Sequence, residues 1–511
     1  MVQESHAPVV RRNGTVSTSE VQTSTTFECD FQYKEAVKKL NGLQSNADVL
    51  RKRRENWHNL ESENVPAVVK FLGRIGRQQN DLQRLHAVHV AGTKVRERIR
   101  INGVPLDKAK FTKYFNEVYG ALESKQDFAG DMPPYFKFLT VLGFHVFLAE
   151  SVDVAIVEVG IGGQYDCTNV IQHPWAVGIT TLDIEHVHLL GSTIEEIAWQ
   201  KAGILKPGAK AYTASQCSAA LAVIENRAKE RECRVGVVPP LPVDVELGIR
   251  GQVQRENAAL AVRLANAWVQ KFERETSSSS SSSCGPPIPL PTGPHSPTSP
   301  PSWLYFEHPL ALQDLSANVL RGLGLCRWPG RAQILRTRDA VFFLDGAHTQ
   351  NSCAMCSKWF QSSSEEENTA KASPVKRVLI FSCTGERDPR PLLAPLALVG
   401  FEVVIFCPTV VKRAMDVASD QTNFTQDEIM AGRQLRRERE SWLDLTSCEE
   451  KSVHVCASIS EALDRLQDVV RSGQPVSAVE SLGSTPPHVL VTGSLHLVGG
   501  VLGLIQDDPA V

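Results

Sequence analysis

The stretch "VDVAIVEVGIGG", residues 152–163, decides the fold class. A short, continuous apolar run that ends in glycines is typical of a strand buried in a parallel sheet. Glu158 ends the apolar part of this run, and the glycines after it allow backbone to approach a ligand closely. Ligands of open parallel sheets bind beyond the carboxyl ends of the strands, so we expect a site at this point.

The same pattern repeats on both sides of this stretch. A second apolar run lies in "WAVGITTLDIEH", and "STIEEIAWQKAGILKPG" predicts a helix that opens with a capping box from Ser192 to Glu195. Five later runs alternate with helical stretches: "AVFFLDGAH", "KRVLIFSCTG", "EVVIFCP", "SVHVCAS" and "HVLVTGS". This alternation predicts two α/β domains with parallel sheets and crossover helices, joined near Cys326–Arg331.

Composition shifts mark the domain boundaries. Residues 1–31 are rich in Ser and Thr and are predicted to be a disordered tail. Residues 276–303 contain seven consecutive serines and then dense proline, which predicts a linker or insertion. We therefore expect a first domain over 32–275 and a second over 304–511.

Composition also excludes several classes of protein. The 511 residues carry a net charge of −3, so no basic field indicates nucleic acid. No segment is predicted to span a membrane. The twelve cysteines show no disulfide framework and are expected to be reduced thiols. The one CxxC, Cys353 and Cys356, is interpreted as two small residues on a helix face rather than as a zinc or redox site.

Polar residues follow the predicted strands of the first domain. Glu158 is either a metal-binding carboxylate or a capping or surface acid. Asp183, Glu185, His186 and His188 follow the next strand and indicate a second metal position, but spacing does not choose between the two histidines.

The remaining candidates lie in a helix end and in the second domain. Lys201 occupies the last turn of its predicted helix, where the helix dipole alone favours a cation. Asp345 suits a ribose hydroxyl and His348 a phosphate or a proton transfer, although "LDGAH" also fits an ordinary tight turn. Arg331, at the domain junction, could reach a phosphate across the cleft.

The stretch "HVAGTKVRERIRING", His89–Gly103, begins like a phosphate loop and then stops being one. An apolar run leads into Gly92-Thr93-Lys94, but the second Gly, the Lys and the Ser or Thr that such a loop requires do not follow. An unrelated phosphate-loop kinase or GTPase is disfavoured for the same reason.

Eight collinear motifs resemble the folylpolyglutamate synthases, a family of the Mur-ligase superfamily. They are "RERIRING", "MPPYFKFLT", "VEVGIGGQYDCTNVI", "IAWQKAGILKPG", "WPGR", "LDGAH", "TGERDP" and "VLVTGSLHLVGGVL". The resemblance implies an N-terminal ATPase-like parallel-sheet domain and a smaller Rossmann-like C-terminal domain. A peptidoglycan-precursor ligase shares this fold, but "RERIRING" and "VTGSLHLVGG" favour the folate type.

The resemblance also implies a reaction. ATP phosphorylates the γ-carboxylate of a reduced folate, and the amine of L-glutamate attacks the acyl phosphate to form an amide. ATP and Mg²⁺, with a monovalent cation as a further candidate, are the implied cofactors. We expect a monomer in the cytoplasm, with mitochondria as the alternative compartment.

The family pattern assigns roles to the candidates. Glu158 would hold one magnesium ion and His186, rather than His188, the other. Lys201 matches a lysine that is carbamylated in the superfamily and supports the second metal.

The same pattern assigns the nucleotide contacts. Asn257, in "RENAALA", would lie near the adenine, although Val253 departs from the pattern there. Arg331 would contact the terminal phosphate, Asp345 the ribose and His348 the phosphate region, so Lys201 and His348 are the catalytic candidates.

The major departure falls between Lys94 and Val95. The family continues G-T-K-G-K-G-S into a helix, a strand and a folate-contacting loop before "RERIRING", whereas this chain passes almost directly from Lys94 to that motif. A skipped exon or a gene-model error is the simplest hypothesis. We expect ligase activity to be impaired, with a non-catalytic isoform as the alternative.

Overall fold

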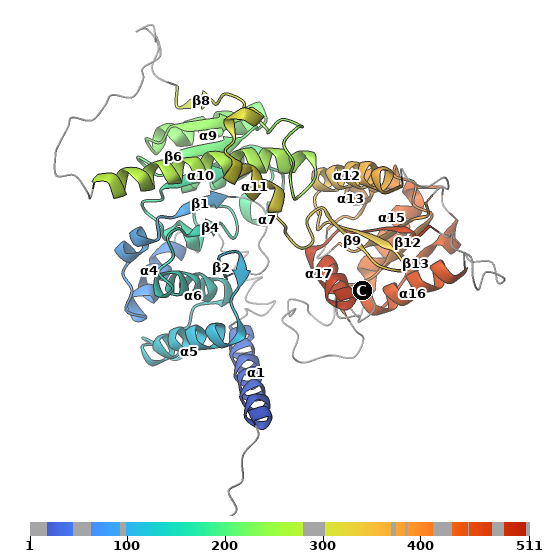
Figure 1. Cartoon of the computed structure of the whole chain (residues 1–511), viewed down its shortest axis with the longest axis horizontal. Coiled ribbons are helices and arrows are strands. Elements are labelled where there is room, and N and C mark those ends of the chain that lie inside the picture. Colours follow the sequence, from blue (N-terminus) through green and yellow to red (C-terminus); the bar gives the residue numbers. More distant parts are fainter. Residues whose placement is uncertain are drawn as a thin grey trace, which may run out of the picture.

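A computed structural model describes residues 18–43, 63–91, 99–278, 302–368, 375–383, 387–411, 432–447, 449–472 and 485–506. Two α/β units lie side by side in Figure 1, the first drawn in blue to yellow and the second in orange to red. The predicted fold class is confirmed, because each unit is built on its own six-stranded sheet.

The first sheet is entirely parallel and has the order β4-β1-β5-β6-β7-β8. Its strands are β1 (Val88–Ala91), β4 (Ile156–Glu158), β5 (Ala176–Ile179), β6 (Lys210–Ala214), β7 (Val235–Val238) and β8 (Leu304–Phe306). A separate ribbon pairs β2 (Arg100–Ile101) with β3 (Val104–Pro105). Buried apolar clusters lie on both faces of the sheet, as the continuous apolar runs predicted.

Three helical layers surround this sheet. One face carries α8 (Ile194–Lys201) and α9 (Ser218–Glu230), and the other carries α10 (Gln252–Ser278) and α11 (Ala317–Leu325). A third cluster joins α1 (Thr18–Gly42), α4 (Asn64–Arg74), α5 (Lys108–Ser124) and α6 (Tyr135–Ala149). Short turns complete the unit: η1 (Gln79–Leu85), η2 (Cys167–Val170), α7 (Val187–Leu190), η3 (Ala202–Ile204) and η4 (Leu312–Asp314).

The strand that the opening stretch predicted is real but lies at an edge of the sheet. β4 has only three residues and pairs with β1 on one side. On its other side no strand of the described chain is paired with it, and Ile156 is 71% exposed. The prediction of a fully buried strand is therefore wrong for β4, because the sheet ends there.

Two predicted boundaries also change. β8 pairs with β7, so residues 304–325 belong to the first unit and the Ser/Pro-rich segment is an insertion within it. The junction near Cys326–Arg331 is the better of the two predicted boundaries. The helix α1 begins at Thr18, inside the expected tail 1–31, because its later part packs against α5 through Ala36 and Leu40.

The second sheet is parallel except for one edge strand and has the order β13-β12-β11-β14-β10-β9. Its strands are β9 (Gln333–Arg336), β10 (Val341–Leu344), β11 (Arg377–Phe381), β12 (Val403–Phe406), β13 (Val453–Val455) and β14 (His488–Thr492). The helices are α12 (Gln350–Asn368), α13 (Arg390–Ala397), α15 (Arg433–Leu445), α16 (Ile459–Ser472) and α17 (Leu495–Gln506), with the turn η5 (Glu450–Ser452). Cys353 and Cys356 are buried in the core beneath α12, which agrees with their structural interpretation.

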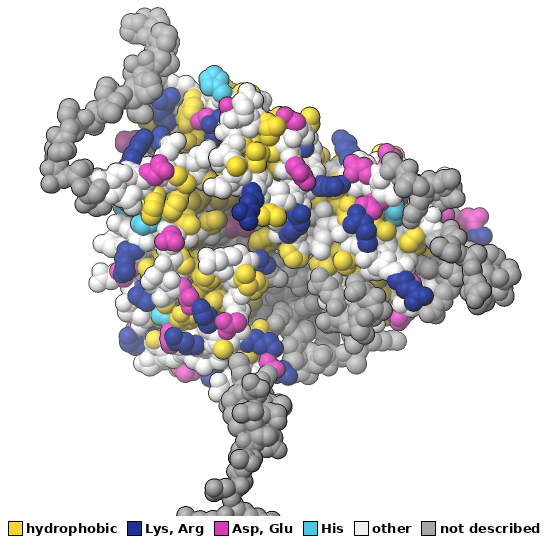
Figure 2. Space-filling view, in the orientation of Figure 1, with side chains coloured by type: hydrophobic (Ala, Val, Ile, Leu, Met, Phe, Trp, Pro, Cys, Tyr) yellow, Lys and Arg dark blue, Asp and Glu magenta, His cyan; other side chains and the backbone are white. Residues whose placement is uncertain are grey.

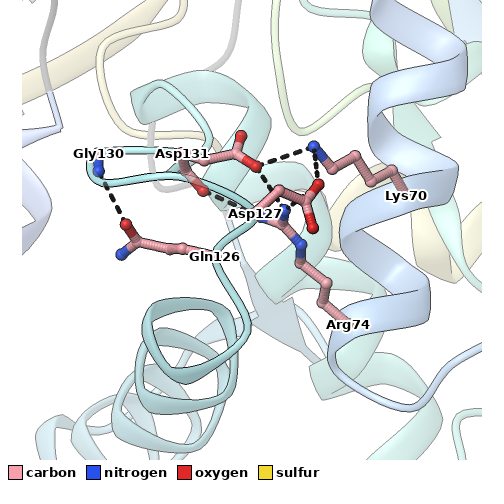
Figure 3. Close-up of polar contacts among 6 residues, drawn as sticks. All are labelled: Lys70, Arg74, Gln126, Asp127, Gly130 and Asp131. Carbon is pink, nitrogen blue, oxygen red and sulfur yellow. Dashed lines mark hydrogen bonds and ion pairs between the residues drawn. The ribbon is translucent and has the colours of Figure 1, made fainter.

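An ion-pair cluster fastens α4 to the loop that enters α6 (Figure 3). Lys70 Nζ lies 2.8 Å from both Asp127 and Asp131, and Arg74 pairs with the same two carboxylates. Hydrogen bonds from Lys70 and then Arg74 lower the pKa of Asp131 to about 2. The cluster therefore fixes the start of α6, whose N-cap is Pro134.

Candidate active site

The ends of β4 and β5, which pair with β1 on either side, bring acidic groups to one edge of the first sheet. Glu158 ends β4 and lies beside Val90 of β1. Thr180–Asp183 follow β5, and Gln216 holds this segment by donating to the Thr180 carbonyl at 2.8 Å and accepting from the Leu182 amide at 3.0 Å. The parallel register therefore places Glu158 and Asp183 on the same side of the molecule.

A cavity of about 1020 Å³ opens between the two units at this edge. Five of the seven predicted site residues line it: Glu158, Asn257, Arg331, Asp345 and His348. Asp183 and Glu185 also contribute to its wall. Residues that are far apart in the sequence and come from both units thus face one space, as the strand-end argument predicted.

The Glu158 carboxyl is largely withdrawn from water. Burial raises its pKa to about 7, and the charges of Arg331 and Lys201 act in the opposite direction. An acid in this position can therefore exchange a proton or bind a cation near neutral pH.

Lys201 lies behind the cavity wall rather than on it. Its Nζ is 3.1 Å from Glu185 Oε1, and the two side chains are only 3% and 5% exposed. The helix that carries Lys201 is capped by Thr193 and Glu196, one residue later than the predicted box, because Thr193 rather than Ser192 accepts from the backbone. The ion pair links this helix to the segment after β5.

A buried hydrogen-bond chain supports the glycine-rich loop after Glu158. Asp166 accepts from the Ile161 amide at 3.1 Å and from the Thr168 hydroxyl at 2.6 Å. Because that hydroxyl donates to Asp166, His89 donates to it from Nε2, at 2.9 Å. Burial lowers the pKa of His89 to about 3, so its ring is neutral.

Gly163 explains why this loop needs glycine. A Cβ there would lie 2.7 Å from the Gln200 carbonyl and 3.0 Å from the Lys201 carbonyl. The loop therefore packs directly against the end of the helix that carries Lys201.

The second unit supplies the other wall. Asp345 directly follows β10 and accepts from the Ala332 amide at 2.9 Å. His348 follows in the same loop, with its Nδ1 3.1 Å from the Gly346 carbonyl. Thr349 donates to Asp183 across the cleft at 2.7 Å, which ties the two strand ends together.

Some of the predicted site residues do not lie at the cavity or lie outside the described residues. His186 is exposed, has a left-handed backbone (φ 49°) and does not line the cavity. Gly92-Thr93-Lys94 and the first three residues of "TGERDP" lie outside the described residues.

Sequence reasoning missed two contacts across the cleft. Thr349 was passed over, although it directly follows "LDGAH". The Arg100 guanidinium lies 4.6 Å from the centre of the Trp328 ring, so "RERIRING" and "WPGR" are in contact. This contact is not visible in either motif alone.

Comparison with known proteins identifies the chain. No family model matches it. A Mycobacterium tuberculosis folylpolyglutamate synthase complexed with ADP and AMPPCP superimposes with a TM-score of 0.61 at 20% identity, over 87% of this chain and 95% of that one. A folylpolyglutamate synthase–AMPPCP–folate complex gives 0.59 at 20% identity, over 93% and 100%. The fold is thus that of the solved folylpolyglutamate synthases.

Sequence relatives narrow this class to one family. The human mitochondrial folylpolyglutamate synthase is 35% identical over 94% of this chain and 92% of its own length. A putative folylpolyglutamate synthase of Caenorhabditis elegans is 35% identical over 92% of each chain. The chain belongs to the folylpolyglutamate synthase family.

Proposed function

We propose that the cavity is the site of ATP-dependent addition of L-glutamate to the γ-carboxylate of a reduced folate, impaired in this chain. One observation carries the proposal: five residues that the family pattern assigns to nucleotide and metal line a single cavity between the two units. A carboxylate is a poor electrophile, so its conversion to an acyl phosphate supplies the leaving group that amide formation needs. The amine then displaces phosphate.

Each wall has a role in this proposal. Asn257 on α10 lies near the adenine, and Asp345 at the end of β10 accepts from the ribose hydroxyls. Arg331 and His348 contact the phosphates, where a fixed positive group stabilises charge that develops during transfer. Lys201, held by Glu185, supports the metal side of the cavity.

The described residues fit a magnesium site in part. Among them, no group of three or more His, Cys, Asp or Glu side chains could hold a metal ion. Magnesium is commonly bound by one or two carboxylates together with phosphates and water, and Glu158 offers such a carboxylate. When bound, the ion neutralises phosphate charge. His186 remains a proposed ligand for a second ion, without support from the cavity lining.

Impairment follows from the segment that is missing after Lys94. The alignment with the human relative extends over 562 residues, more than the 511 of this chain, so it contains positions at which this chain has no residue. The cavity also continues past its polar part into a hollow beneath α10, lined by Val154 and Ile156 of the β4 side and by Ala261 and Ala265 of the helix. Hydrophobic side chains gather in that hollow in Figure 2. Both observations support the loss of a packed element.

The direct test is ATP-dependent transfer of labelled glutamate to tetrahydrofolate. It compares the chain as it stands with a version that carries the human segment between Lys94 and Val95. The proposal expects turnover in the restored version and far less in the chain itself. Equal turnover refutes the impairment, and no turnover in either refutes the function.

The alternative is a non-catalytic isoform that retains a binding or regulatory capacity. The missing phosphate loop favours it. Calorimetry with ATP separates the two, because an isoform without nucleotide binding gives no heat, whereas an impaired enzyme gives weak, magnesium-dependent binding.

We propose reduced folate and L-glutamate as the ligands, with ATP, Mg²⁺ and a monovalent cation as cofactors, and a monomer as the working form. Among the described residues, no helix is both long and apolar enough to cross a membrane. The cytoplasm is the proposed compartment and mitochondria the alternative, which the names of the mammalian relatives favour. Fractionation of cells that express the tagged chain decides between them.

A further inference from the structure

A carboxyl group is buried in the second unit away from the cavity. Glu438, on α15, is 0% exposed. Its Oε1 accepts the Cys383 amide at 2.8 Å, directly after β11. Its Oε2 has no hydrogen-bond partner within the described part of the chain. Burying a carboxyl group costs free energy that an apolar side chain would not, so its position here calls for a reason.

Gln434 lies one helical turn before Glu438 and contacts the same segment. Its Nε2 is 2.8 Å from Cys383 Sγ and donates to the Arg387 carbonyl at 3.2 Å. Residues four apart on a helix share one face, so Glu438 and Gln434 act on one target. Together they hold Cys383 and Arg387, which flank the start of the connection from β11 to α13.

The side chain of Arg387 contacts a residue that lines the cavity. Its Nη1 donates to the His348 carbonyl at 3.3 Å. The His348 amide donates to Ser352 Oγ at 3.0 Å, so the backbone of this residue is held from both sides. Because His348 lines the cavity, the hydrogen bonds of Gln434 to Arg387 and of Arg387 to His348 link the helix α15 to the cavity wall.

We propose that Glu438 and Gln434 are positioning residues for the ligase site, which set the place of Arg387 and thereby the backbone of His348. The expected change in kcat rests on the proposed function, whereas the expected change in the backbone of His348 does not. A hydrogen bond is directional and holds the group it binds in one position, whereas an apolar contact of similar volume does not. Glu438 acts through other residues and does not contact a reactant.

The test measures hydrogen–deuterium exchange of peptides that cover residues 344–352. It compares Glu438→Leu, Glu438→Gln and Gln434→Leu in the full chain, with Glu440→Leu as the control, since Glu440 is exposed on the same helix. Glu438→Leu and Gln434→Leu should speed exchange in these peptides several-fold. Glu438→Gln keeps an accepting oxygen, so exchange in these peptides should stay close to that of the unchanged chain. The control should change nothing.

The kinetic arm uses the same variants in the restored version. A displacement of a reacting arrangement by about 1 Å can cost up to about a hundredfold in rate. Glu438→Leu should therefore lower kcat about tenfold with KM values unchanged, and Glu438→Gln should retain kcat. A loss of thermal stability with unchanged exchange at 344–352 overturns the proposal. Absence of turnover in the parent refutes the proposed function instead, and the exchange arm still decides this inference.

Discussion

Removal of the Glu185 carboxylate should destabilise the first unit strongly. Glu185 and Lys201 are 3.1 Å apart, and their side chains are 5% and 3% exposed. At an effective dielectric constant of about 20, two charges at this separation attract by roughly 5 kcal/mol. Glu185→Ala leaves the lysine charge buried and unpaired, for which the cost is about 3–5 kcal/mol.

A matched control separates burial from charge. Asp30 and Lys108 are 2.7 Å apart in the same unit, but their side chains are 45% and 57% exposed. Asp30→Ala should therefore cost far less than Glu185→Ala, because water screens the pair and solvates the remaining lysine. A double variant, Glu185→Leu with Lys201→Met, should regain most of the lost stability, since neither charge is left alone.

Urea unfolding followed by tryptophan fluorescence measures these differences as changes in the free energy of unfolding of the first unit. The expected order of loss is Glu185→Ala, then the double variant, then Asp30→Ala. If Glu185→Ala is no worse than Asp30→Ala, the pair is not buried in solution and Lys201 does not lie behind the cavity wall. If the double variant is as unstable as the single one, packing rather than charge dominates.

Three further predictions concern other parts of the molecule. Gly163→Ala should cost about 1–3 kcal/mol in urea unfolding, because its Cβ would meet two carbonyl oxygens, whereas Gly120→Ala, which meets nothing, should be neutral or stabilising. Burial raises the pKa of Glu438 to about 8 from its usual 4.5, so the unfolded chain binds fewer protons and stability should fall as pH rises from about 5 to about 8. Glu438→Gln should flatten that dependence; an unchanged pH profile contradicts the raised pKa. Ile156→Lys should reduce aggregation in light scattering without loss of stability, because Ile156 is exposed on an edge strand.

Local pattern predicted seven of the fourteen strands of the described chain and part of the site. Each apolar run that was expected to be a strand contains one, and the strand-end rule placed Glu158 and Asp345 on opposite walls of one cavity. These successes have a common cause, since periodicity and strand direction are local properties of the chain.

The failures that affect the fold and the site depend on long-range contacts. The position of β4 at an edge depends on which strands pair with it, and the assignment of β8 to the first unit depends on a contact across a long insertion. The Ser/Pro-rich composition marked where the chain cannot pack, but it carried no information about which sheet resumes afterwards. His186 shows the same limit at the level of a side chain, because a left-handed backbone turns it away from the lining of the cavity.

The edge position of β4 suggests that the missing segment also affects the position of Glu158. Glu158 is positioned by a strand that is hydrogen-bonded only to β1 within the described chain. A strand paired on one side has fewer constraints on its register than one paired on both. If the restored segment adds a strand beside β4, it should act twice: it supplies the phosphate loop and it fixes Glu158. Restoration should then lower hydrogen exchange in β4 as well as raise turnover. A version that regains nucleotide binding while exchange in β4 stays unchanged would separate these two effects and show that the edge strand needs no partner.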